Sequence, residues 1–404
     1  MSNFIKWLKI KNFFSIKDEI KIDLKANKYT IEQYPHRLFK FEDDYYNKTI
    51  SFYGANASGK TSILKSIIVI SAIINNNDEN ILPFSTKNKF ANANSKTELT
   101  INFVIDNNEY EYYISLNSNS SKQNISISNE ILYEIINNRR KTLFNKKEKK
   151  INIKLDDEIK NVLFNSLNDK LSVFSEFTKF DTKKLTKIRD FFKNILETTN
   201  IERAYTTTMG ITQRDERKLV FNIMENGNIK KFIMKFLISI GIDIEDIEVE
   251  FDTDDNNQIK SIKNILLYHN IDKKNPLEYQ LESDGTKMLL KILLDIYLTY
   301  KNKSVLIIDE FDSVLHSMLV PFIIHLMQEN NIQFFYTTHN LYNLKFLYSD
   351  EIFFIDKNSK HITTISSPKN NKDIEGYENF LSLYENRYLG GLPDIKTIFT
   401  KIEE

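Results

Sequence analysis

The sequence predicts an α/β fold built around a mostly parallel sheet. Three short apolar runs, at residues 50–52, 305–308 and 332–336, have the character of buried strands. The first run leads into a glycine-rich turn and an apolar helix, and the other two are followed by acidic residues or by a histidine. Parallel sheets bind ligands at the carboxyl ends of their strands. We therefore expect a ligand site along this edge of the sheet.

The composition is that of a globular protein. The chain has 404 residues, of which 41% are apolar and 27% charged, enough for one large domain or about two to three smaller ones. Lysine plus arginine number 55, as do aspartate plus glutamate, so no overall field favours nucleic acid or a membrane. The absence of cysteine excludes disulfides, thiolate metal sites and cysteine nucleophiles. With no signal-peptide pattern and no apolar run of membrane length, we expect a cytoplasmic protein without a membrane partner.

Residues 54–61 read G-A-N-A-S-G-K-T, which fits the Walker A phosphate-loop pattern between a strand and a helix. Gly54 and Gly59 let the backbone turn tightly, so that its amides and the helix N-terminus form a nest for phosphate. Lys60 supplies a charge to the β- and γ-phosphates, and the Thr61 hydroxyl suits Mg²⁺. The predicted cofactors are therefore ATP and Mg²⁺. The expected ATP-binding residues are Gly54, Ala55, Asn56, Ala57, Ser58, Gly59, Lys60, Thr61 and Ser62.

An acidic pair follows the strand at residues 305–308. Asp309 falls at the carboxyl end of that strand, where it would hold Mg²⁺ together with Thr61. Glu310 points elsewhere and would polarise the attacking water. Acidic residues after a strand also start helices, and without the phosphate loop that simpler interpretation would be preferred. With the loop present, the pair predicts a site for nucleotide hydrolysis.

A histidine, His339, follows the strand at residues 332–336. A single histidine is usually structural or solvated. At a strand end, in a chain with a phosphate loop and an acidic pair, it predicts a contact to the γ-phosphate. The predicted catalytic residues are therefore Lys60, Glu310 and His339.

The stretch L-E-S-D-G-T-K-M-L-L at residues 281–290 raises a separate question. Taken alone it is a helix start, capped by Ser283 or Asp284, with an apolar face behind it. Caps are far commoner than ligand sites. The same device, a capped helix N-terminus with a positive dipole end, also binds anions. The residues by themselves leave both interpretations open.

The order of these features resembles that of the ABC-type ATPases of the SMC and OLD group. In that group a signature motif lies just before the strand that carries the acidic pair, and Ser283, Asp284 and Gly285 occupy its places. The resemblance implies that this motif binds the γ-phosphate of ATP held by the other subunit. Two ATPase heads would then enclose two nucleotides, in a homodimer or a higher homo-oligomer.

Further parts of the family pattern fit less completely. Ser313 and Leu315 match the D-loop, whereas His316 stands where acidic residues are common. No glutamine lies between Thr61 and Lys122, so the Q-loop residue is unassigned. More narrowly, the chain resembles the small AAA-family ATP-binding proteins of bacterial abortive-infection and anti-phage loci. Three segments carry this resemblance: SFYGANASGKTS, QLESDGTKMLLKILL with VLIIDEFDSVLH, and YENRYLGGLPDI, a partial match in which Asn386 replaces a glycine.

We expect three parts along the chain. Residues 1–130 would form the N-terminal part of the ATPase head, with an opening strand pair and a hairpin at residues 98–116. Residues 131–220 would form a mainly helical insert, and residues 221–404 the C-terminal part of the head. The basic run at residues 139–150 is either a solvated face or a contact for nucleic acid.

Two functions follow from these features. The first is an ATPase that acts as sensor or regulator of a bacterial anti-phage system and controls a separately encoded effector, which we expect to be a nuclease. The second is an SMC-like DNA-maintenance or repair clamp that binds DNA through the insert. A transporter subunit fits less well, because the Q-loop glutamine is missing. The residues after His339 are too few for a Toprim nuclease domain, which needs on the order of 100 residues.

Overall fold

The computed structural model of the chain describes residues 2–75, 87–92, 94–119, 124–147, 150–153, 172–177, 183–198, 227–253, 259–269, 275–311, 315–358, 362–371 and 379–386. The chain divides into two compact units. Unit 1 comprises residues 1–193 and 337–404, and unit 2 comprises residues 194–336. The phosphate loop and His339 therefore belong to unit 1, whereas the acidic pair and the signature residues belong to unit 2.

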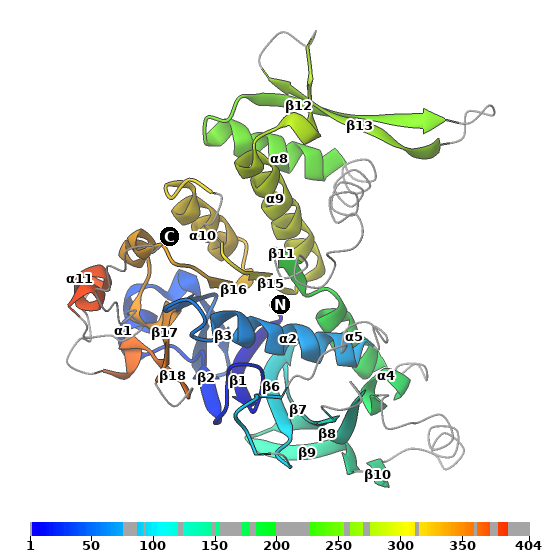
Figure 1. The fold of residues 1–404 in the computed structure, drawn as a ribbon, viewed down its shortest axis with the longest axis vertical. Coiled ribbons are helices and arrows are strands. Elements are labelled where there is room, and N and C mark those ends of the chain that lie inside the picture. Colours follow the sequence, from blue (N-terminus) through cyan, green and yellow to red (C-terminus); the bar gives the residue numbers. More distant parts are fainter. Residues whose placement is uncertain are drawn as a thin grey trace, which may run out of the picture. The chain divides into compact units, whose positions relative to one another are not determined.

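An antiparallel sheet dominates unit 1, with strand order β10-β9-β8-β7-β6-β1-β2 (Figure 1). The predicted opening strand pair and the hairpin at residues 98–116 are both confirmed. Asp106 and Asn107 join β6 to β7 with φ values of 48° and 61°, a two-residue turn that suits the twist of a hairpin. The strands are β1 (Phe4–Lys11), β2 (Ile20–Asp23), β6 (Thr97–Ile105), β7 (Asn108–Asn119), β8 (Asn124–Ile136), β9 (Arg139–Lys147) and β10 (Lys150–Ile153).

The expectation of helix from Ile131 onward is wrong for residues 131–153. Those residues end β8 and form β9 and β10, which extend the antiparallel sheet. Asn137 and Asn138, with φ values of 50° and 60°, make the turn between β8 and β9. Helix begins later, in α4 (Val173–Phe177) and α5 (Lys183–Lys193). Residues 154–171 lie outside the described part of the chain, so the helix expected there is untested.

A buried carboxylate ties α4 to the sheet. Glu130 on β8 accepts hydrogen bonds from the Tyr112 hydroxyl at 2.9 Å and the Ser172 hydroxyl at 2.6 Å. It also accepts from the backbone amides of Val173 and Phe174, at 2.7 and 3.1 Å. Burial raises the pKa of the Glu130 carboxyl, while these donors act in the opposite direction. The carboxylate therefore serves as the cap of α4.

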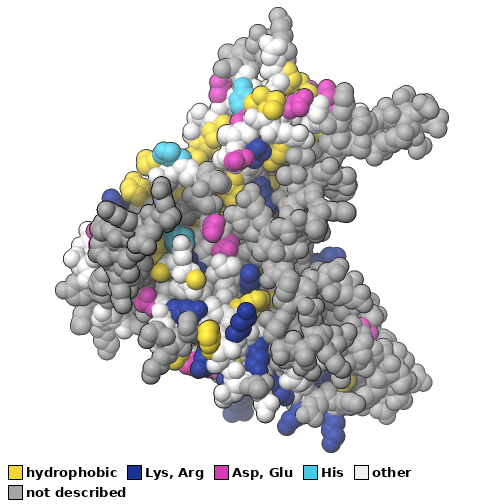
Figure 2. All heavy atoms as spheres, viewed as in Figure 1, with side chains coloured by type: hydrophobic (Ala, Val, Ile, Leu, Met, Phe, Trp, Pro, Cys, Tyr) yellow, Lys and Arg dark blue, Asp and Glu magenta, His cyan; other side chains and the backbone are white. Residues whose placement is uncertain are grey.

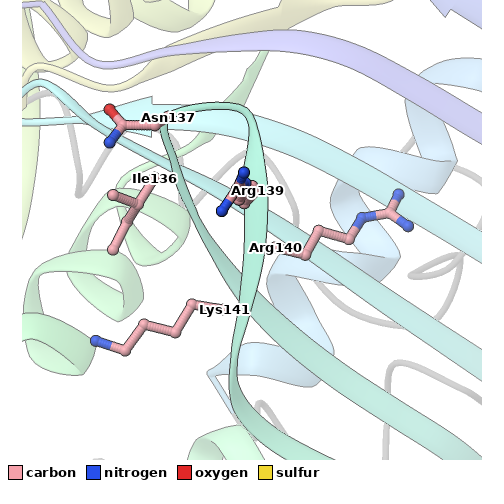
Figure 3. Close-up of a pocket in the computed structure, with 5 residues that line it drawn as sticks. All are labelled: Ile136, Asn137, Arg139, Arg140 and Lys141. Carbon is pink, nitrogen blue, oxygen red and sulfur yellow. The ribbon is translucent and has the colours of Figure 1, made fainter.

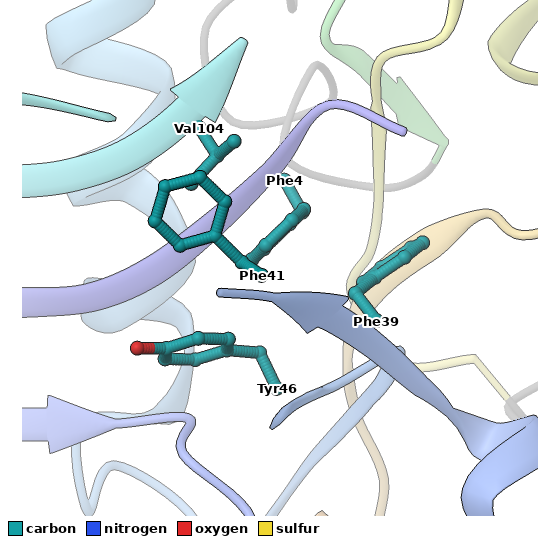
Figure 4. Packing of buried hydrophobic residues seen from close by; sticks show 5 residues of the cluster. All are labelled: Phe4, Phe39, Phe41, Tyr46 and Val104. Atoms are coloured by element: carbon teal, nitrogen blue, oxygen red, sulfur yellow. The ribbon is translucent and has the colours of Figure 1, made fainter. Parts of the chain in front are cut away.

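A small hairpin, β3 (Leu38–Phe41) with β4 (Asp44–Asn47), packs against β1 and β6 of the sheet (Figure 4). The Phe4 ring stacks on Phe39 with centroids 4.8 Å apart, and it lies 5.5 Å from the Tyr46 ring. Phe41 and Val104 complete this buried apolar cluster. The contacts join β1, β6 and the hairpin into one core.

In unit 1 the phosphate loop lies between the strand that precedes it, β5 (Thr49–Tyr53), and the predicted apolar helix that follows it, α2 (Lys60–Ile74). β5 pairs in parallel with β17 (Ile352–Lys357), which pairs antiparallel with β18 (Thr363–Ser366). Short helices complete the unit: α1 (Lys28–Gln33), α11 (Phe380–Glu385) and the 3₁₀ helices Pro35–Arg37, Leu341–Phe346, Ser349–Glu351 and Pro368–Asn370.

Unit 2 contains the other predicted strands. β11 (Leu196–Thr198), β15 (Val305–Ile308) and β16 (Gln333–Thr337) run parallel, and the last residue of β16 already belongs to unit 1. The helices are α8 (Gly227–Ser239), α9 (Asp284–Asn302) and α10 (Leu319–Glu329). A second antiparallel sheet consists of β12 (Ile244–Thr253), β13 (Ile259–His269) and β14 (Leu277–Glu278).

The α/β class, with parallel core strands and an antiparallel part, is therefore confirmed. None of the described helices combines the length and the apolar character required to cross a membrane.

Candidate functional site

The predicted phosphate loop connects β5 to α2 within unit 1. Its backbone has positive φ at Gly54 (153°), Ala57 (61°) and Gly59 (124°). Such values favour glycine, so both glycines stand where the turn needs them. The strand, the tight turn and the helix therefore follow one another as the pattern predicts.

The turn has no space for a side chain at either glycine. A Cβ on Gly54 would lie 2.3 Å from the Ile355 carbonyl oxygen, and one on Gly59 would lie 2.9 Å from Ser15 Oγ. No side chain in the described part of the chain caps α2 at Gly59. The Ser58 hydroxyl is buried and has no hydrogen-bond partner among the described residues. A close-packed turn, an uncapped helix start and a buried hydroxyl together fit a phosphate group.

Lys60 is the first residue of α2, and its side chain reaches back into the phosphate loop. Its side chain is buried, and Nζ donates to the carbonyl oxygens of Gly54 at 2.8 Å and Ala55 at 3.1 Å. The ammonium is therefore held within the turn, at the start of α2. A cation at this place suits the negative charge of a nucleotide phosphate.

Two neighbouring segments brace the loop from one side. The Ser15 hydroxyl lies 2.7 Å from that of Ser62 on α2. Thr363 on β18 donates from Oγ1 to the carbonyl oxygens of Ser15 and Ser58, at 3.1 Å each. These contacts join the loop to the N-terminal segment and to β18. Sequence reasoning missed them, because no local pattern marks partners that lie 47 to 348 positions apart in the chain.

We expect Gly54→Ala to weaken nucleotide binding about tenfold or more, since the new methyl group would collide with the Ile355 carbonyl and hold a strained backbone. The measurement is ATP affinity by calorimetry. Gly227→Ala is the matched control, because a Cβ there has no atom within 4 Å. An unchanged affinity of Gly54→Ala would contradict the assignment of this loop.

His339 belongs to the same unit as the loop. The preceding residue, Thr338, donates its amide to the Phe52 carbonyl at 3.2 Å, so this segment runs beside the end of β5. The Thr338 hydroxyl accepts from the Asn340 amide at 2.9 Å, which turns the chain directly around His339. His339 itself is exposed. Its placement near the end of β5 agrees with the expectation of a phosphate contact, which stays a prediction.

The acidic pair follows β15 in unit 2, at the carboxyl end predicted for it. Asp309 is buried and Glu310 is exposed, so adjacent residues present their carboxylates to different surroundings. Glu310 has a φ of 54°, in the left-handed region that a residue with a Cβ rarely adopts. Such strain is concentrated at functional sites, which is consistent with a catalytic role.

The signature stretch begins α9, also in unit 2. Ser283 is the N-cap, and its Oγ accepts from the Thr286 amide at 3.1 Å. Ser283 and Asp284 are exposed, and Gly285 is half-buried. The cap is therefore confirmed, and the cap residues remain open to a further partner.

The D-loop is described only in part. Ser313 lies outside the described residues, whereas Leu315 is buried. His316, which departs from the family pattern, accepts at Nδ1 from the Met318 amide at 3.3 Å. Among the described residues, no group of three or more His, Asp or Glu side chains is arranged to hold a metal by itself.

A surface pocket lies away from the phosphate loop, at the turn between β8 and β9 (Figure 3). Ile136, Asn137, Arg139, Arg140 and Lys141 line it. Arg140 points to one side of the hairpin, where Nη2 lies 2.7 Å from Glu111 Oε1. Lys141 points to the other side, 3.7 Å from Glu134 Oε2. The basic run predicted at residues 139–150 therefore starts at an exposed hairpin turn.

Comparison with solved structures finds proteins of similar fold. One is an SMC head domain from Thermotoga maritima, with 14% sequence identity, a TM-score of 0.44, and coverage of 90% of this chain and 98% of that chain. Another is an SMC head bound to the C-winged helix domain of ScpA, with 13% identity, a TM-score of 0.46, and coverage of 92% and 99%. A search of curated proteins found no match.

A family model described as "AAA domain, putative AbiEii toxin, Type IV TA system" matches residues 50–344. The matched span covers most of the chain and runs from β5 to beyond His339, so that it includes the phosphate loop, the signature stretch and the acidic pair. The chain therefore belongs to this AAA family.

Proposed function

We propose that the protein binds and hydrolyses ATP, and that two copies close around two nucleotides. The observation that carries this proposal is the phosphate loop. Its glycines have no space for a Cβ, no described side chain caps α2, and Lys60 lies within the turn. Family membership supports the same reading, because the matched span contains the whole loop.

Each predicted residue has a definite task in this scheme. Lys60 and the amides of the loop would bind the phosphates of ATP. Thr61 and Asp309 would hold Mg²⁺, which neutralises phosphate charge and orients the reacting group. Glu310 would accept a proton from the attacking water, and His339 would contact the γ-phosphate.

The exposed start of α9 supports the closure of two copies. Ser283 and Asp284 are exposed, and the neighbouring Leu281 leaves 71% of its surface accessible. A polar cap beside an exposed leucine suits a contact that a second copy completes. We infer that Ser283, Asp284 and Gly285 bind the γ-phosphate of ATP held by the partner, and that the D-loop residues Ser313 and Leu315 take part in the same closure.

We further propose that this cycle controls a separately encoded effector in a bacterial anti-phage system. The family description names an AbiEii toxin and a toxin–antitoxin system, which supports a role in defence. ATP binding would favour the closed pair, and hydrolysis would release it. The effector, which we expect to be a nuclease in the cytoplasm, would be held in one state and freed in the other.

The test is purification of the Glu310→Gln protein with ATP from its own host, followed by mass spectrometry of what stays bound. We expect a stoichiometric second protein that is absent from a Lys60→Ala preparation, because only the former retains nucleotide. Protection against phage by this protein alone, with no neighbouring gene, would contradict the regulator role.

The alternative function, an SMC-like DNA clamp, has one specific observation in its favour. Arg139, Arg140 and Lys141 are exposed at the turn between β8 and β9. Figure 2 shows lysine and arginine side chains along the part of unit 1 that carries β6 and β9. Nucleic acid without a protein partner in the same purification would favour the clamp. DNA affinity that falls steeply with salt would support it further.

A further inference from the structure

One carboxylate links the signature stretch to the sheet of unit 2. His269, the last residue of β13, has Nε2 2.7 Å from Oε2 of Glu282. The other oxygen of Glu282 accepts from the Ser283 amide at 2.8 Å. An ionised carboxylate only accepts hydrogen bonds, so the imidazole ring donates to it. Glu282 therefore bridges β13 and the N-cap of α9.

The chain around this bridge leads directly from the sheet to the helix. β13 pairs with β14, and β14 continues through the 3₁₀ helix Tyr279–Leu281 to Glu282. Lys287 on the first turns of α9 donates from Nζ to the Gln280 carbonyl at 3.3 Å. In Figure 1, the long strands β12 and β13 run side by side next to α8, in the same unit as α9. The position of Ser283 thus depends on that of β13.

Burial makes this bridge stronger than an ordinary surface pair. The Glu282 side chain is 9% exposed and that of His269 is 36% exposed. A shielded carboxylate is less screened by water than two open groups, and its hydrogen bonds are correspondingly stronger. Ser283, by contrast, is exposed. The bridge therefore lies just beneath the surface that carries the cap residue.

The body of α9 is fixed independently of the bridge. Thr198 on β11 donates from Oγ1 to Oδ2 of Asp295, a buried bond of 2.7 Å in the middle of α9. Thr198 is also paired in register with Ile308, directly before the acidic pair. Because the helix is held at Asp295, a displacement of β13 would move mainly its first turns. Those turns carry Ser283, Asp284 and Gly285.

We propose that His269 is a positioning residue for the signature stretch, and that the β12–β13 hairpin controls hydrolysis through Glu282. This rests on the proposed function, in which Ser283 binds the γ-phosphate of ATP held by a second copy. With the bridge intact, the cap residues point where the partner's nucleotide needs them. A binding partner that shifts β13 breaks the bridge and slows hydrolysis, without touching the phosphate loop.

The test compares steady-state hydrolysis in three variants of the full chain. His269→Leu removes the donor and is expected to lower kcat about tenfold at unchanged KM for ATP, because positioning is lost while the loop in unit 1 is intact. His269→Gln places an amide near the position of Nε2 and should restore most of kcat. Tyr268→Phe, which removes a neighbouring hydrogen bond from β13 to Glu248 on β12, should behave as wild type. The melting temperatures of His269→Gln and Tyr268→Phe should stay close to that of wild type, whereas His269→Leu should melt somewhat lower but remain folded, because the shielded Glu282 carboxylate loses a donor.

A second readout does not depend on turnover. In a Glu310→Gln background, His269→Leu should weaken ATP-dependent association of two copies about tenfold, as measured by sedimentation. Wild-type kcat and association in His269→Leu would overturn the inference, as would equal losses in His269→Gln or Tyr268→Phe. Ser283→Arg distinguishes a failure of this inference from a failure of the proposed function. If that variant hydrolyses ATP and associates normally, the proposed function itself fails.

Discussion

Glutamine in place of Glu310 should leave ATP bound and slow its hydrolysis by about 100-fold or more. The amide has nearly the shape of the carboxylate but cannot take a proton from water. Glu310 is exposed after β15, with a φ of 54°, whereas the adjacent Asp309 is buried. The strained residue is therefore the one that can reach a water molecule. A trapped, ATP-bound pair of copies is the expected consequence.

The measurement is phosphate release, together with ATP-dependent association by light scattering. Glu329→Gln, which alters another exposed acid of unit 2 at the end of α10, is the matched control and should leave both unchanged. Hydrolysis at the wild-type rate by Glu310→Gln would show that a different group activates the water.

The short motifs could be placed from the sequence because each has a local physical cause. The strand at residues 305–308 was predicted with the bounds of β15, and the N-cap of α9 was predicted at Ser283 or Asp284. Buried parallel strands are short apolar runs, and caps need a small polar side chain. Such features depend on a few neighbouring residues, so one sequence is enough to find them.

The error at residues 131–153 has an equally physical origin. Ile131, Leu132, Ile135 and Ile136 are spaced as on a helix. In β8, however, the side chains that turn inward are Glu130, Leu132 and Glu134, and two of those are charged. Glu130 caps α4 and Glu134 pairs with lysines, so partners distant in sequence offset the burial of charge. A pattern of apolar residues cannot reveal a strand whose buried face is partly ionic.

Long-range contacts were also beyond reach. Arg37 donates to Glu351 at 2.8 Å and lies over the Tyr348 ring, which ties the segment after α1 to the turn before β17. His269 and Glu282 are only 13 positions apart in the sequence, yet no sequence pattern marks the two residues as partners. Hydrogen bonds between distant elements form only where the fold brings those elements together, so the residue types alone do not predict them.

Ser283→Arg and Lys60→Ala should each abolish ATP hydrolysis when pure, and a mixture of the two should recover it. The arginine would block the start of α9 but leave the phosphate loop intact. Lys60→Ala removes the cation held at 2.8 Å from the Gly54 carbonyl, so its own loop no longer binds ATP, while its signature stretch is unchanged. Ser283→Arg therefore supplies an intact phosphate loop, and Lys60→Ala supplies an intact signature stretch.

An equal mixture would form mixed pairs with a single complete site, which predicts about a quarter of the wild-type rate if copies pair at random. The rate should rise from near zero as one variant is titrated into the other, with a maximum at equal amounts. Lys28→Glu, a charge change at an exposed residue of α1, is the control and should show no such dependence on mixing. If Ser283 acted on the nucleotide of its own copy, the mixture would stay inactive at every ratio. Recovery thus requires that the phosphate loop and the signature stretch of one site come from different copies.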